Sequence, residues 1–169
     1  MHLVLEVLAY AADEAECTGA GKAIVRVHAD GSVSVTDSGR GTDTRAGNRG
    51  RVVRKPVMTS KDLRFFDFPR AALLPDGHPR CGMSVVAALS EWLVHTSRRR
   101  EGAWAQRYEH GIPATDLVPL PAGDVTGTAV HFLPDPALVA GTHIPLRGLR
   151  ELAGAFGPQL SVEIIDKPR

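Results

Sequence analysis

Hydrophobic and polar positions follow two different periods in the first forty residues of the chain. The stretch "HLVLEVLAYAADEAEC", which starts at His2, repeats apolar residues at the three- and four-residue spacing of a helix. Gly19 and Gly21 are expected to end it, because glycine is common just beyond a helix. The next stretch, "AIVRVHADGSVSVTDSG", alternates apolar and polar residues around the turn "ADGS", which predicts a β-hairpin.

The remaining segments predict a mixture of helices and strands. Residues 42–80 are rich in proline, glycine and arginine without a clean period, which indicates a long loop with at most one short helix. The stretch "GMSVVAALSEWLVHTS" (82–97) predicts a helix, "EGAWAQRYEHG" and "GTAVHFLPD" predict strands, "IPLRGLRELAGAFG" predicts a helix ended by Gly157, and "QLSVEIIDKPR" predicts a last strand. This order predicts an α+β fold, a two-layer sandwich with helices on one face of a mixed β-sheet.

Length and composition indicate one domain over residues 1–169. The chain is 43% hydrophobic and 23% charged, as is typical of a soluble globular protein. Its net charge of +1 argues against a general nucleic-acid binder, and Arg98–Arg100 are expected at a solvated strand end or turn. No apolar stretch is long enough to cross a bilayer, and the amphipathic start is unlike a signal peptide, so we expect a cytoplasmic protein without a membrane segment.

Cysteine and histidine spacing gives no sign of a metal centre. Cys17 and Cys81 are the two cysteines, they form no CxxC motif, and the seven histidines are scattered without the spacing of ligands. We therefore expect no metal site and two buried or free thiols.

Three acidic residues stand in positions that call for an explanation. Glu6 and Asp13 lie in a helix that is mostly apolar, and a buried carboxylate is costly unless it is paired or faces a wet pocket. Asp37 ends a strand beside Gly39 and Gly41. This arrangement fits either an ordinary turn or a ligand site in which the acid faces a pocket.

Four fragments, in order, carry a resemblance to a known family: "EVLAYAADEA", "ADGSVSVTDSGRG", "GMSVVAALSEWL" and "TGTAVHF". The chain resembles the ATP-binding domain of the DNA gyrase B subunit. That domain has the Bergerat-type (GHKL) fold, which is shared with Hsp90 chaperones, histidine kinases and MutL.

The resemblance implies that the adenine half of a nucleotide pocket is retained. In that family the strand-end aspartate, here Asp37, accepts a hydrogen bond from the adenine amino group. Gly39 and Gly41 then let the base lie against the backbone, and Thr128 supports the adenine contact. Arg40 matches an arginine that pairs with a helix carboxylate, here Glu14, and either a structural salt bridge or a ligand role fits this pair.

The same resemblance indicates that the phosphate and metal half has changed. Glu6 matches the general base, but Tyr10 stands where the family has an Mg²⁺-binding asparagine, while Asp13 is retained. Residues 42–81 resemble a degenerate ATP lid, in which "PDGHPRCGMS" keeps Gly77 and Gly82 but has an arginine in place of the middle glycine. Ala105 stands where the family has an arginine, and Arg64, Phe65 and Phe66 stand where the family's lid has a Gly-Gly-Lys run. Glu6 is then a vestigial base, and a metal site is not expected.

Three functions remain open at this point. The first is an adenine-nucleotide-binding domain for ATP or ADP with a degraded Mg²⁺ site and little or no hydrolysis. The second is a non-binding pseudo-ATPase that acts as a protein-interaction or decoy module, and the third is a slow ATPase completed by a partner. The family's N-terminal arm and transducer domain have no counterpart within residues 1–169, so we expect no topoisomerase activity from this chain alone. We also expect no direct DNA binding, and either a monomer or a dimer through a surface that the family does not use.

Overall fold

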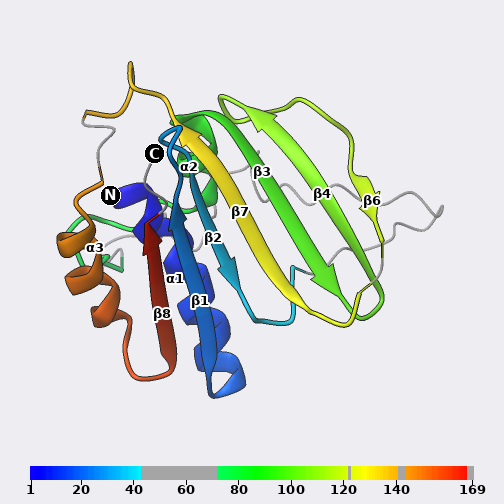
Figure 1. Ribbon diagram of the computed structural model, residues 1–169, viewed down its shortest axis with the longest axis horizontal. Helices are drawn as coiled ribbons and strands as arrows, with labels where there is room; N and C mark the ends of the chain where they lie inside the picture. Colours follow the sequence, from blue (N-terminus) through cyan, green and yellow to red (C-terminus); the bar gives the residue numbers. More distant parts are fainter. Residues whose placement is uncertain (43–71, 122, 141–143, 167–169) are drawn as a thin grey trace.

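The computed structural model describes residues 1–42, 72–121, 123–140 and 144–166 (Figure 1). Its elements, in chain order, are α1 (His2–Thr18), β1 (Gly21–Val27), β2 (Val33–Asp37), α2 (Met83–Ala88), β3 (Ser90–Arg99), β4 (Gly102–Glu109), β5 (Ile112–Pro113), β6 (Val118–Leu120), β7 (Gly127–Pro134), α3 (Leu146–Ala153), the 3₁₀ turn η2 (Gly154–Phe156) and β8 (Leu160–Asp166).

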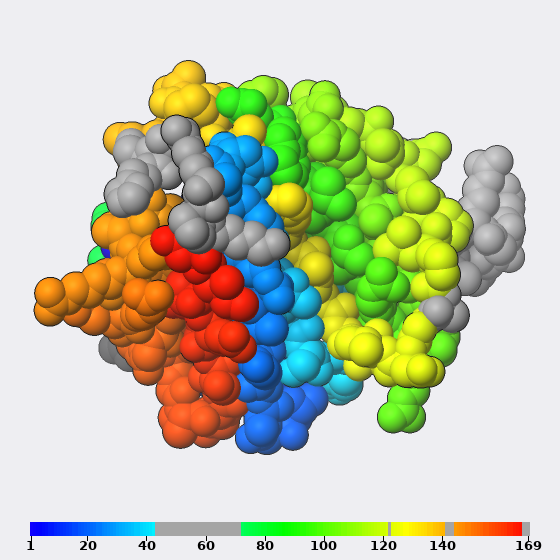
Figure 2. All heavy atoms as spheres, viewed as in Figure 1, coloured from blue at the N-terminus to red at the C-terminus, as the bar shows by residue number. Residues whose placement is uncertain are grey.

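The strands form one eight-stranded mixed sheet. Their order is β5-β4-β3-β7-β2-β1-β8, and β6 pairs with β4. Strands β1 and β8 run parallel, and the other neighbours run antiparallel. The view in Figure 1 looks onto the strands with α1 behind them, and Figure 2 shows β8, β1, β2, β7, β3 and β4 side by side with none of the described helices over this face. This is the two-layer α+β sandwich of Bergerat type that the sequence predicts.

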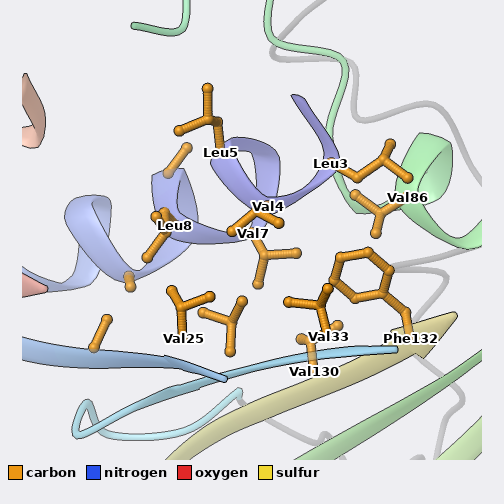
Figure 3. Packing of buried hydrophobic residues seen from close by; sticks show 14 of the residues in the cluster. Leu3, Val4, Leu5, Val7, Leu8, Val25, Val33, Val86, Val130 and Phe132 are labelled. Atoms are coloured by element: carbon orange, nitrogen blue, oxygen red, sulfur yellow. The ribbon is translucent and has the colours of Figure 1, made fainter. Parts of the chain in front are cut away.

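The core lies between α1 and the sheet (Figure 3). Val7 and Leu8 on α1 and Val25, Val33 and Phe132 on the strands are all buried in this layer. Burial of one such side chain contributes about 1.5–3 kcal/mol to stability, so this layer fixes the helix on the sheet. As predicted, α1 ends at a glycine: its C-cap is Gly19, in the left-handed conformation with φ 87°.

One sequence-based prediction, the long helix over residues 82–97, is wrong. Helix α2 covers Met83–Ala88, and the chain continues as strand β3 from Ser90 to Arg99. The apolar residues that suggested one helix face belong to two elements, because "SEWLVHTS" also alternates and pairs with β4 on one side and β7 on the other. Tertiary pairing along the whole strand outweighs the weak local preference.

The other predicted elements are present. The hairpin is β1–β2, the two later strands are β7 and β4, and α3 with η2 ends at Gly157. β3 ends at Arg99 and Arg100 lies in a turn. Both cysteines are free, Cys17 being exposed and Cys81 half-buried. Most of the expected long loop, residues 43–71, lies outside the described residues. Near its end, the bridge between Leu73 and Pro79 closes a turn.

Candidate functional site

A cavity of about 410 Å³ lies between α1 and the sheet. Its walls come from α1 (Val7, Tyr10, Ala11, Asp13, Glu14, Cys17), from β2 (Val35, Asp37), from β3 (His95), from β7 (Thr128, Val130), and from Gly41, Thr42 and Met83. The volume is within the range of small-molecule sites, and mostly apolar walls with a few convergent polar groups are typical of such sites.

Strand register explains why the sheet presents these residues together. Val35 pairs with Val130, which pairs with His95, so the three side chains lie in one row on the helix side of the sheet. In the next row Thr128 pairs with Ser97, and the Thr128 amide donates to Asp37 Oδ1 at 3.2 Å. A strand carries alternate side chains to opposite faces, so residues two apart in sequence meet at one cavity.

Asp37 is a half-buried carboxylate at the end of β2 that lines this cavity. Its Oδ1 accepts hydrogen bonds from the amides of Gly39 (2.8 Å) and Thr128 (3.2 Å). Burial raises the pKa of the Asp37 carboxyl, and these two amide donors oppose that rise. Both amides bind Oδ1, so Oδ2 can accept a hydrogen bond from an amino group in the cavity.

Two glycines let the backbone pass close to Asp37 and its neighbours. Gly41 has φ 76°, and a Cβ at this position would overlap the carbonyl of Arg98. Gly127 has φ 142°, and a Cβ there would overlap the carbonyl of Asp37. Only glycine tolerates both the conformation and the approach, so a side chain at either place would displace the cavity wall.

Glu14 and Arg40 form the pair that the sequence suggested. The Arg40 Nε and Nη2 groups donate to the two Glu14 oxygens at 2.7 and 3.0 Å, and the Arg40 amide donates to Oε1 at 2.9 Å. These bonds lower the pKa of the Glu14 carboxyl. The Arg40 side chain is 65% exposed, so the pair holds the turn after β2 against α1 without contributing much stability.

Glu6 lies outside the residues that line the cavity and is fully buried. Its Oε1 accepts from the Cys81 amide at 2.6 Å and its Oε2 accepts from the Gly82 amide at 2.9 Å. The next amide, of Met83, donates to the Tyr10 hydroxyl at 3.2 Å. Three consecutive backbone N–H groups at the start of α2 therefore bind side chains of α1.

Arg80 fills the space beside Tyr10. Its guanidinium donates to both Asp13 oxygens at 2.9 and 2.8 Å and lies 4.7 Å from the centre of the Tyr10 ring. The Arg80 side chain is 9% exposed and that of Asp13 is 48% exposed; Tyr10 and Asp13 line the cavity, whereas Arg80 packs outside its lining. A two-pronged Arg–carboxylate contact over an aromatic ring fixes all three side chains.

Three relatives among known proteins are B subunits of DNA gyrase or DNA topoisomerase 4. The chain is 34% identical to the B subunit of DNA topoisomerase 4 from Bacillus subtilis and 35% identical to the B subunit of DNA gyrase from Thermotoga maritima, over 98% of its length in both cases. It is 33% identical to the mitochondrial DNA gyrase B subunit of Arabidopsis thaliana over 96% of its length. The chain belongs to the family of DNA gyrase and topoisomerase 4 B subunits. No protein-family model matches it.

The chain spans about a quarter of the length of these relatives, 26%, 27% and 24% respectively. No helix among the residues described has the length and apolar character needed to cross a membrane.

Six of the fourteen residues that line the cavity of this gyrase B relative were predicted from the sequence as site residues. Asp37, Gly41, Thr128, Tyr10, Asp13 and Glu14 line the cavity as a group. Gly39 lies just outside and donates to Asp37, while Gly82 is the N-cap of α2 and donates to Glu6. Among the lining residues that were not predicted is His95, because residues 82–97 were taken for a helix and not for a strand that reaches the cavity.

His95 places a neutral imidazole in the cavity wall. It is 4% exposed, and burial lowers its pKa from 6.5 to about 4. Its ring stacks on Trp104, with ring centres 5.1 Å apart and an angle of 28° between the planes. A neutral imidazole offers one hydrogen-bond donor and one acceptor. His95 is therefore a polar group in a part of the cavity wall that is otherwise formed by Val35 and Val130.

Proposed function

We propose that this chain is a gyrase-B-like adenine-nucleotide-binding domain that holds ATP, ADP or a related adenine ligand with little or no hydrolysis. The observation that carries the proposal is Asp37, a half-buried carboxylate that lines the cavity with Thr128 and Gly41. A carboxylate acceptor in an apolar cavity favours a ligand with an amino group, such as adenine.

The contacts before α2 support weak binding of phosphate groups. Backbone amides at the start of a helix bind anions when their N–H groups are free to face the ligand. Here the amides of Cys81 and Gly82 donate to Glu6, and the amide of Met83 donates to Tyr10. A phosphate would have to displace the chain's own carboxylate, so the triphosphate is expected to add little affinity.

The side chains near Tyr10 do not fit a Mg²⁺ ion. Magnesium requires several oxygen ligands in near-ideal geometry. The Asp13 carboxylate binds Arg80 and the Glu6 carboxylate binds two amides, while the phenol of Tyr10 is a poor ligand. Glu6 is also fully buried and lies outside the residues that line the cavity, which disfavours its activating a water beside a ligand there. These contacts favour a vestigial base and a lost metal site.

Calorimetric titration with adenosine, ADP and ATP, each with and without Mg²⁺, tests the proposal. Adenosine and ADP should bind with similar affinity, and Mg²⁺ should change neither value by much. Asp37→Asn should weaken adenosine binding about tenfold or more, because a hydrogen bond to a charged group contributes about 1.5–3 kcal/mol. The matched control, Asp124→Asn at an exposed position, should leave binding unchanged.

Other outcomes of this titration identify the other candidate functions. If none of the three ligands binds at millimolar concentration, the proposal is wrong and the chain is a non-binding pseudo-ATPase. If ATP binds much more tightly with Mg²⁺ and phosphate is released, a slow ATPase is the correct function. The relatives act in DNA gyrase and topoisomerase 4, but this chain spans a quarter of them, and we propose neither DNA binding nor topoisomerase activity for it alone.

A further inference from the structure

Outside the cavity, the start of α1 and the turn before α2 bring three potential metal ligands together. His2, Asp76 and His78 each offer one ligand atom, and these atoms all lie within 4.8 Å of one another. His2 Nδ1 is 2.7 Å from Asp76 Oδ2, and His78 Nδ1 is 3.5 Å from Asp76 Oδ1. We propose that these three side chains bind a divalent transition-metal ion, with zinc as the best fit.

The donor chemistry selects the class of ion. Two imidazoles and one carboxylate form a three-ligand set typical of zinc and related metals, with a fourth position for water. Two donors on a tetrahedral zinc ion are about 3.3–3.6 Å apart, since each Zn–N or Zn–O bond is about 2.0–2.2 Å. Small side-chain rotations bring the three atoms to that spacing, and His78, which is 73% exposed, can make such a rotation.

The second nitrogen of His2 supports this assignment. His2 Nε2 is 3.3 Å from Oε1 of the buried Glu6. A histidine that binds metal through one ring nitrogen commonly donates its other N–H to a carboxylate, which fixes the tautomer and the ring orientation. Glu6 is itself held by the amides of Cys81 and Gly82, so this supporting contact is rigid.

The turn that carries the other two ligands is also ordered by its own hydrogen bonds. The Leu74 amide donates to the His78 carbonyl at 2.9 Å, and the Gly77 amide donates to the Leu74 carbonyl at 2.8 Å. The His78 amide donates to Asp76 Oδ1 at 3.1 Å. An ion at this site would fasten the turn 74–78 to the first turn of α1, and little chain entropy would be lost on binding.

Zinc titration of tag-free protein by calorimetry tests the site, with thermal unfolding as a second readout. Wild type should bind one Zn²⁺, and its unfolding temperature should rise with Zn²⁺ concentration. His78→Asn and Asp76→Asn should each weaken binding at least tenfold and remove the thermal shift. His110→Asn is the matched control, because His110 is also exposed and lies 3.6 Å from Asp135. Asparagine also tolerates the positive φ of 46° at this position.

Three results decide the matter. Equal zinc affinity in His78→Asn and wild type would overturn the proposal, as would wild type that gives no zinc signal. Loss of binding in Cys17→Ser would also overturn it and assign the ion to the exposed thiol. The site does not depend on the proposed function, so His78→Asn should bind adenosine as wild type does, and a failure of adenosine binding would leave the zinc result intact.

Discussion

Asp37 and Glu6 are both acids that accept hydrogen bonds from backbone amides, but Asp37 is half-buried and Glu6 is fully buried. Asp37 accepts two amides on one oxygen and lines the cavity. Glu6 accepts one amide on each oxygen and lies away from the cavity. The same side-chain chemistry thus lines a cavity in one case and binds only within the protein in the other.

At the residue scale, His95 predicts an acid-dependent loss of stability. The folded protein keeps His95 neutral down to about pH 4, whereas the unfolded chain is protonated below its ordinary value of 6.5. The unfolded state binds more protons in this window, so the free energy of unfolding falls as the pH falls through it. Urea unfolding at pH 7 and pH 5 should show a loss about 2 kcal/mol smaller in His95→Leu than in wild type.

The control for this measurement is an exposed histidine. His110→Asn should retain the wild-type difference between pH 7 and pH 5, because the His110 side chain is 56% exposed in the folded protein. An identical loss in His95→Leu and wild type would show that the imidazole is solvated in the native protein.

At the element scale, the short helix α2 depends on α1 for its start. Three amides at residues 81–83 bind Glu6 and Tyr10, and the N-cap residue of α2, Gly82, has no side chain to provide a cap. Arg80 adds a second attachment to α1 through Asp13. The segment before α2 is therefore held by side chains of another element rather than by its own local structure.

Glu6→Gln tests this attachment. The glutamine amide would turn its NH₂ group toward one of the two backbone donors, which leaves a buried N–H without an acceptor. We expect a loss of about 1–3 kcal/mol in the free energy of unfolding and faster hydrogen exchange at the amides of Cys81 and Gly82. Glu16→Gln, at an exposed position of the same helix, should change neither quantity. Unchanged exchange in Glu6→Gln would contradict the contacts described for Glu6.

At the scale of the whole molecule, the cavity exists only where α1, three strands and the turn after β2 meet. Its lining residues span positions 7 to 130, and several of them, including Val7, Val35 and Val130, also belong to the buried core between α1 and the sheet. A ligand bound there contacts elements that separate on unfolding, so binding and global stability are linked.

Adenosine should therefore stabilise the whole fold. At a concentration one hundred times its Kd, the linkage is worth about 2.7 kcal/mol, which raises the unfolding temperature of a chain of this size by about 5–10 °C. Differential scanning calorimetry at several adenosine concentrations measures this shift. Guanosine serves as the control ligand and should give a smaller shift. Equal shifts with the two nucleosides would contradict a role for Asp37 in selecting the base.

The sequence by itself determined the fold class, most of the larger elements and most of the cavity's polar residues. Local patterns carry this information: helical spacing in α1, alternation around the "ADGS" turn, and the strand-end motif of Asp37 with its glycines. The pairing of Glu14 with Arg40 was also accessible, because both stand in recognisable motifs.

Only the tertiary structure decided where β3 begins, how Glu6 is used and which distant side chains meet. Residues 90–99 become a strand because β4 and β7 pair with them on both sides, and no local pattern contains those partners. Glu6 meets Cys81 and Gly82 across seventy-five and more positions, and His2 meets Asp76 across seventy-four. Such contacts depend on the packing of one element on another, which sequence spacing does not encode.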